Sequence, residues 1–144
     1  MGARTTAREA ALQMLYAVEA SEHPVEHVIR EFWRELPADA EARPYADTIV
    51  RGVTEKVQDL DGRISAASSN WRVERMTRVD RGLLRLGAWE IVYSREVPRA
   101  VILDEAVELA KRFGTAESSS FVNGVLARIA DDCGRLDAPA GQRG

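Results

Sequence analysis

The sequence predicts an all-α protein, a compact bundle of about seven helices in two adjacent helical groups. Apolar residues recur at three- and four-residue spacing through almost the whole chain, which is the period of a helix that buries one face. Stretches that alternate apolar and polar residues, as strands do, are missing from the sequence, and so are repeats. At 144 residues the chain has the size of one domain. We expect a single helical domain over residues 1–133 and a flexible tail over residues 134–144.

Two amphipathic helices are expected at the start of the chain. The first begins near Arg4. The second follows Pro24, whose fixed φ suits a first helical turn, and it ends before Pro37. Their apolar faces consist of Ala7, Ala11, Met14, Leu15 and Val18, and of Val25, Val28, Ile29, Phe32 and Leu36.

A long third helix is expected after a polar loop at residues 38–43. It runs from Pro44 toward a break at Ser68–Asn70. Gly52 and Gly62 weaken it, because each costs about 1 kcal/mol relative to alanine in a helix interior. The apolar positions of this helix are Ile49, Val53, Val57, Leu60 and Ile64.

The second half of the chain carries clearer start and stop signals. Thr77 followed by Asp80 resembles a capping box that opens a helix through the segment GLLRLGAWEIVYS. Pro98 precedes the next helix, and Gly114 suits its end. The last helix, SSSFVNGVLARIA, ends before Cys133. The apolar faces of the last two helices consist of Ile102, Ala106, Leu109 and Phe113, and of Phe121, Val122, Val125, Leu126 and Ile129.

The composition predicts a cytoplasmic protein. Cys133 is the single cysteine, which suits a reducing compartment, and no apolar run has the length of a membrane span. The chain has 20 basic residues, nearly all of them arginine, the side chain that suits phosphate better than lysine does. Codon bias in a GC-rich genome explains the same excess. The formal net charge of −3 gives no general reason to expect a polyanion partner.

Neither a metal centre nor a catalytic site is indicated. His23 and His27 are spaced like two ligands on one helix, but zinc needs a third ligand and usually a fourth, and the chain has no other histidine. Glu105 and Glu108 share a helix face, yet no nucleophile or glycine-rich phosphate loop accompanies them. We therefore expect a protein that is not an enzyme and that uses no cofactor.

Arg4 and Arg8 stand one turn apart at the start of the first helix. They lie about 40° apart around the helix axis, beside the apolar face rather than opposite it, and Tyr16 continues the same edge. The N-terminal end of a helix also favours a bound phosphate. A phosphate-binding edge and an ordinary solvated helix start fit these residues equally well.

Further arginines share one side of a later helix. Arg78, Arg81 and Arg85 are spaced three and four apart. They could form a stripe that faces phosphates, but an exposed face offset by neighbouring acidic residues is the interpretation that we favour.

Three segments carry a family resemblance. ARTTAREAALQMLYA, VDRGLLRLGAWEI and VPRAVILDEAVELAKRFGTAESSSFVNGVL resemble the NusB family of transcription antitermination factors, from about Arg4 to Ile129. The resemblance implies a small helical RNA-binding protein without catalysis. Its relatives bind the single-stranded boxA element of ribosomal RNA leaders together with a small-subunit ribosomal protein that acts as NusE. The pair joins the RNA polymerase antitermination complex and supports ribosomal RNA transcription.

The resemblance also assigns site residues. For Phe121 a purely core position is the alternative, for Asn123 a buried hydrogen bond, and for Asp80 a role only in the capping box. The residues implied in RNA binding are Arg4, Arg8, Tyr16, Glu117, Phe121 and Asn123, and those implied on the NusE side are Asp80 and Glu90.

One departure and two alternatives remain. Some relatives have arginines where this chain has Thr5 and Thr6, so fewer phosphate contacts are expected here. One alternative is the related RNA-binding domain at the N-terminus of ribosomal RNA cytosine methyltransferases, although this chain is expected to be too short for their catalytic domain. The other is a purely protein-binding helical adaptor, such as a homodimer.

Overall fold

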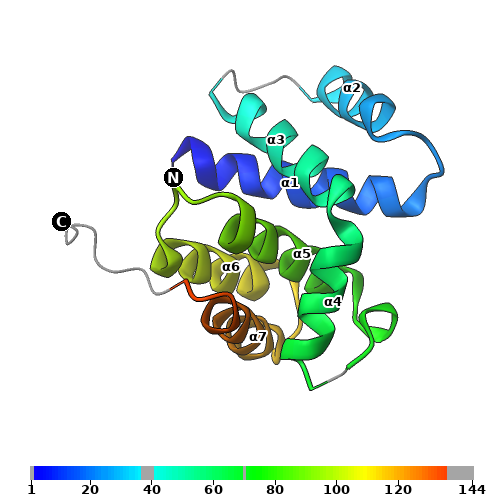
Figure 1. Ribbon diagram of the computed structural model, residues 1–144. Helices are drawn as coiled ribbons and strands as arrows, with labels where there is room; N and C mark the ends of the chain where they lie inside the picture. The colour runs from blue at the N-terminus through cyan, green and yellow to red at the C-terminus, as the bar shows by residue number, and fades with distance from the viewer. Residues whose placement is uncertain (1, 37–40, 70, 136–144) are drawn as a thin grey trace.

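The computed structural model describes residues 2–36, 41–69 and 71–135, and within these ranges all regular structure is helical (Figure 1). The all-α prediction is therefore confirmed. The described elements are α1 (Ala3–Ala20), α2 (Val25–Glu35), α3 (Ala42–Glu55), α4 (Val57–Ala67), a short 3₁₀ helix η1 (Val73–Arg75), α5 (Arg78–Tyr93), α6 (Arg99–Phe113) and α7 (Ser118–Asp132).

The helices form two groups that meet along α5. Helices α1, α2 and α3 make one group, and α4 to α7 make the other (Figure 1). Helix α5 packs against α1, α3, α4, α6 and α7, so it lies at the centre of the molecule. A helix in this position must be apolar on nearly every side, which explains the run LLRLGAWEI in its sequence.

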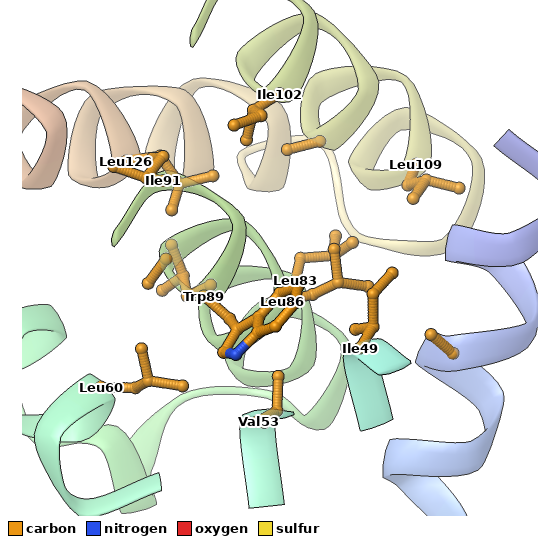
Figure 2. Packing of buried hydrophobic residues seen from close by; sticks show 14 of the residues in the cluster. Ile49, Val53, Leu60, Leu83, Leu86, Trp89, Ile91, Ile102, Leu109 and Leu126 are labelled. Atoms are coloured by element: carbon orange, nitrogen blue, oxygen red, sulfur yellow. The ribbon is translucent and has the colours of Figure 1, made fainter. Parts of the chain in front are cut away.

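The core is continuous across both groups. Figure 2 shows side chains of α5 that face α3 and others that face α6 and α7. Leu84 and Ile91 are fully buried, as are Ile49 of α3 and Leu126 of α7. Because one helix supplies side chains to both groups, we treat residues 2–135 as one packed unit.

Polar contacts attach α2 to α3. The indole Nε1 of Trp33 donates to Oδ1 of Asp47 at 2.7 Å, and Asp47 is itself buried. Arg51 donates to both carboxylate oxygens of Glu26 at 2.7 and 2.9 Å on the surface. These contacts help to orient a helix in which only Val28 and Ile29 are buried.

The predicted third helix is in fact two helices, α3 and α4. The break falls at Lys56, with φ −107° and ψ 17°, and neither Gly52 nor Gly62 causes it. The expectation of one continuous helix from Pro44 to Ile64 is wrong, because α3 packs on α1 and α4 packs on α7, and one straight helix would not reach both.

The ends of these two helices also differ in detail from the prediction. Helix α3 begins at Ala42, so Pro44 lies in its first turn, where a missing N–H costs nothing. Ala42 and Arg43, which the sequence predicts in a loop at 38–43, thus belong to α3. Residues 38–40 of that loop lie outside the described residues. The expected break after α4 is confirmed at Ser68 and Ser69, the latter with φ 59°.

The described chain ends on a buried arginine, Arg135. Its guanidinium donates to the carbonyl oxygens of Glu90 and Ile91 at 3.0 Å each, and to those of Ser94 and Val97. A cation at the C-terminal end of α5 satisfies carbonyls that the helix leaves free. The expected tail at 134–144 is therefore corrected at its start, since Arg135 is 6% exposed. Residues 136–144 lie outside the described residues.

Candidate nucleic-acid and partner interfaces

Arg4 occupies the first turn of α1 and is held at the surface. Its guanidinium carbon lies 4.3 Å from the centroid of the Tyr45 ring of α3, and Nη2 donates to Oε1 of Glu96 at 2.9 Å. The side chain is still 47% exposed. A guanidinium that stacks on an aromatic ring is already ordered, so little conformational freedom is lost when it binds an anion.

Arg8, one turn later, is buried. Its Nε and Nη2 atoms donate to the two carboxylate oxygens of Glu90 at 2.9 Å each, and Nη1 donates to Oε1 of Glu105 at 3.2 Å. The residue is only 2% exposed. The expectation of an exposed Arg8 that contacts phosphate is wrong, because α5 and α6 cover the edge of α1 that carries it.

Glu90 is corrected for the same reason. The family resemblance implies a position on the NusE side, but Glu90 is 1% exposed and receives hydrogen bonds from Arg8 and from the Tyr45 hydroxyl. Burial opposes the charged form of Arg8, yet the hydrogen bonds and the negative charge of Glu90 outweigh it, and the pKa of Arg8 is raised. The cluster of Arg8, Glu90, Glu105 and Tyr45, called the ion cluster below, joins α1, α3, α5 and α6.

Tyr45 is a site residue that the sequence did not predict. Its ring supports Arg4 and its hydroxyl reaches Glu90, so it connects the surface arginine to the ion cluster. One signal was available: Tyr45 lies one turn before Ile49 on the apolar side of a helix, and a covered tyrosine needs a partner for its hydroxyl.

The Tyr45 hydroxyl should ionise only at high pH. Desolvation, followed by the charge and the hydrogen bond of Glu90, raises its pKa to about 12. A pKa raised in the folded state adds stability at lower pH that is lost as the pH rises toward about 12. An ultraviolet phenolate titration should show a late step that Tyr45→Phe removes. If the titrations of Tyr45→Phe and of the parent chain were the same at high pH, this assignment would be contradicted.

Tyr16 lies near the other end of α1 and is exposed, as expected for a stacking residue. The guanidinium carbon of Arg78 lies 5.1 Å from the centroid of its ring, and the side chain is 49% exposed. The ring borders a hollow of about 180 Å³ between α1, α3 and α5, whose apolar lining includes Leu12 and Val79.

The arginines of α5 form ion pairs rather than a free basic stripe. Arg81 donates to both carboxylate oxygens of Glu19 at 2.6 Å, and Arg85 donates to both oxygens of Asp61 at 2.8 Å. The hydrogen bond from Arg81 lowers the pKa of Glu19. The interpretation that acidic residues offset these arginines is supported. The acidic partners come from α1 and α4 and not from α5 itself.

The start of α7 presents two of its three expected residues on one side. Glu117 and Phe121 are one turn apart, and Phe121 is half-buried with its ring centroid 6.5 Å from that of Trp71. Asn123 is exposed, so the alternative of a buried hydrogen bond is wrong. It also lies about 200° around the helix from Phe121, on a different side.

Asp80 lies in the first turn of α5 and takes part in only one half of the predicted capping box. The Thr77 hydroxyl accepts from the Asp80 backbone N–H at 3.1 Å. Within the described ranges, Oδ1 of Asp80 is buried without a hydrogen-bond partner. This oxygen is covered by the protein itself, so only the remainder of the part-exposed Asp80 side chain faces solvent.

Metal-binding and membrane-spanning features are not found in the part of the chain that the structure describes. The rings of His23 and His27 lie 4.4 Å apart, but no group of three His, Cys, Asp or Glu side chains there could hold a metal ion. None of the described helices is long and apolar enough to cross a membrane.

Comparison with known proteins gives similarity over almost the whole chain. The model of the NusB family matches residues 5–131. The transcription antitermination protein NusB of Sorangium cellulosum is 63% identical over 137 residues, which cover 95% of this chain and 98% of that protein.

Solved structures share the arrangement of the helices. NusB of T. maritima matches with a TM-score of 0.81 at 35% identity, covering 90% of this chain and 91% of its own. A structure of the antitermination factors NusB and NusE in complex with double-stranded RNA matches with a TM-score of 0.83 at 25% identity, covering 92% and 98%.

Proposed function

The chain belongs to the NusB family, and we propose that it binds boxA-type RNA of ribosomal RNA leaders together with the ribosomal protein NusE. Members of this family are transcription antitermination factors and not enzymes. The observation that carries the proposal is the match to a structure in which NusB and NusE are bound to RNA. We further propose that the pair joins the RNA polymerase antitermination complex in the cytoplasm.

The RNA contacts that the geometry supports lie along α1. Arg4 and Tyr16 are both exposed and are separated by 12 residues, which is about 18 Å along a helix. Arg4 supplies a positioned charge for a phosphate, and Tyr16 supplies a ring for an unpaired base. A phosphate must compete with Glu96 for Arg4. Because salt screens exposed charges, the proposed phosphate contact should weaken as the salt concentration rises.

The decisive experiment measures RNA binding with and without the ribosomal partner. The proposal expects tight, salt-dependent binding of a single-stranded boxA-type RNA by the complex, and weaker binding by the protein alone. An adaptor that forms a homodimer would bind no RNA in either state. A module like that of the cytosine methyltransferases would bind RNA without any help from NusE.

Arg4→Ala should weaken RNA binding by the complex and flatten its salt dependence. Each phosphate contact contributes roughly 0.7 to the slope for single-stranded RNA. Tyr16→Ala should behave differently, losing about 1–3 kcal/mol of stacking without a change in slope. Fluorescence anisotropy at several salt concentrations separates the two variants. Equal affinities and slopes for Arg4→Ala and the parent chain would refute the proposed phosphate contact.

Asp80→Arg tests the partner side. The change replaces a carboxylate on the proposed partner side with a cation, so a basic group of the ribosomal protein would meet a like charge, which costs several kcal/mol at an interface. We expect at least tenfold weaker binding of the ribosomal protein, measured by calorimetry. The Thr77 hydroxyl still caps the backbone at this position, so thermal stability should change little. A lower melting temperature with intact partner affinity would show that Asp80 serves only the helix start.

A further inference from the structure

We propose that the indole of Trp71 is a stacking platform for an unpaired RNA base, with Phe121 as its support; this inference rests on the proposed function. Trp71 is 56% exposed, more than any other large hydrophobic residue that the structure describes. An indole that is this exposed buries little apolar surface and therefore contributes little to folding.

The exposure of Trp71 does not come from a loose backbone. Its N–H donates to the carbonyl oxygen of Ser68 at 3.2 Å, and the Ser68 hydroxyl donates back to the Trp71 carbonyl at 3.4 Å. On the other side, Val73 and Met76 bury their side chains and anchor η1 in the core. These hydrogen bonds and buried side chains hold the described main chain at Ser68, Trp71 and η1, while the indole stays in solvent.

Phe121 supports the indole from α7. The two ring centroids are 6.5 Å apart and the ring planes meet at 62°, an edge-to-face contact. This tilt leaves no parallel slot between the rings, so a base stacks on the solvent-facing side of the indole. The contact also restricts the indole before any ligand arrives, which lowers the conformational cost of binding.

The surrounding charges favour RNA as the occupant. Arg72 follows directly; its side chain is 70% exposed and lies 3.7 Å from the similarly exposed Glu74 carboxylate, with which a phosphate must compete. Arg75 is exposed as well. Glu117 precedes Phe121 by one turn and is exposed, so its carboxylate can accept a hydrogen bond from the exocyclic amine of a stacked base. An aromatic ring beside arginines is the combination that single-stranded nucleic acid uses.

The site therefore has a stacking surface, cations for the flanking phosphates and an acceptor for the base edge. A base that carries an exocyclic amine should be preferred over uracil at this position, because uracil has no amine to donate to Glu117. A tryptophan with only a structural role would not produce this difference in affinity between RNAs that carry different bases at this position.

The first test is ¹⁹F NMR of the full chain labelled with 5-fluorotryptophan and bound to the ribosomal partner. The chain has three tryptophans, and Trp71→Phe assigns the resonance of Trp71. Adding a single-stranded boxA-type RNA should shift the Trp71 resonance and leave those of Trp33 and Trp89 in place. An unmoved Trp71 resonance at saturating RNA would overturn the inference.

The second test compares affinities. Trp71→Ala should weaken RNA binding by about 5- to 150-fold with an unchanged salt slope, and Trp71→Phe should retain most of the affinity. Arg75→Ala should instead lower the slope by roughly 0.7. Leu36→Ala is the matched control, because Leu36 is also exposed, at 47%, and directly follows α2 in the other helical group.

The outcomes separate this inference from the proposed function. If the parent complex binds RNA and Trp71→Ala binds it equally well, only the inference fails. If Trp71→Ala weakens the ribosomal partner and leaves RNA affinity intact, the surface contacts protein and the inference fails. If the parent complex binds no RNA, the proposed function fails and the inference fails with it.

Discussion

Replacing Arg8 by alanine is expected to lower the free energy of unfolding by about 3–5 kcal/mol. The substitution leaves Glu90, which is 1% exposed, as a buried charge without its cation. The Tyr45 hydroxyl would remain as a donor to Glu90, but one neutral hydrogen bond does not replace the bidentate contact of the Arg8 guanidinium.

Arg4→Ala is the matched control, because Arg4 lies one turn earlier on the same helix. Its ion pair with Glu96 is exposed on both sides, and such pairs contribute at most about 1 kcal/mol. Chemical denaturation followed by circular dichroism should therefore separate two arginines that look alike in the sequence. Equal stability of the two variants would contradict the structural assignment of Arg8.

Arg8→Lys separates the contribution of the positive charge from that of the guanidinium geometry. Lysine keeps the positive charge but cannot donate two parallel hydrogen bonds to Glu90 and a third to Glu105. We expect a stability between those of the parent chain and of Arg8→Ala. If the lysine variant matched the parent chain, charge alone would account for the contribution of Arg8.

Gly52→Ala is expected to destabilise the protein by about 1–3 kcal/mol through overpacking. A Cβ atom at Gly52 would lie 2.2 Å from Nε1 and 2.3 Å from Cε2 of Trp89. Figure 2 shows the indole of Trp89 within the core. A rigid ring that is 9% exposed has little room to move, so α3 and α5 would have to separate.

Gly62→Ala should instead raise the free energy of unfolding. A Cβ atom at Gly62, inside α4, meets nothing within 4 Å. Replacing a helix-interior glycine with alanine then stabilises the protein by up to about 1 kcal/mol. Thermal melts of both variants test the pair, and a stabilised Gly52→Ala would show that α3 and α5 pack less closely than described here.

Much of the fold could be predicted from the sequence because it depends on local physics. The three- and four-residue spacing of apolar side chains fixes which face of each helix is buried, and this gave the all-α class and most helix positions. Pro24, Thr77 and Pro98 marked helix starts correctly, since each acts on the backbone within one turn. The exposure of Arg4 and Tyr16 also agreed with the prediction.

What only the tertiary structure decided were the contacts between helices. Helical spacing places Arg8 beside an apolar face, but only the packing of α5 and α6 shows that this edge is covered and that Glu90 lies there. In the sequence Gly52 and Gly62 are equivalent helix-weakening residues, whereas in the fold one touches Trp89 and the other touches nothing. The break at Lys56 likewise follows from two different packing partners. Periodicity sets the direction of a side chain around its own helix, and only the neighbouring helices determine what that side chain meets.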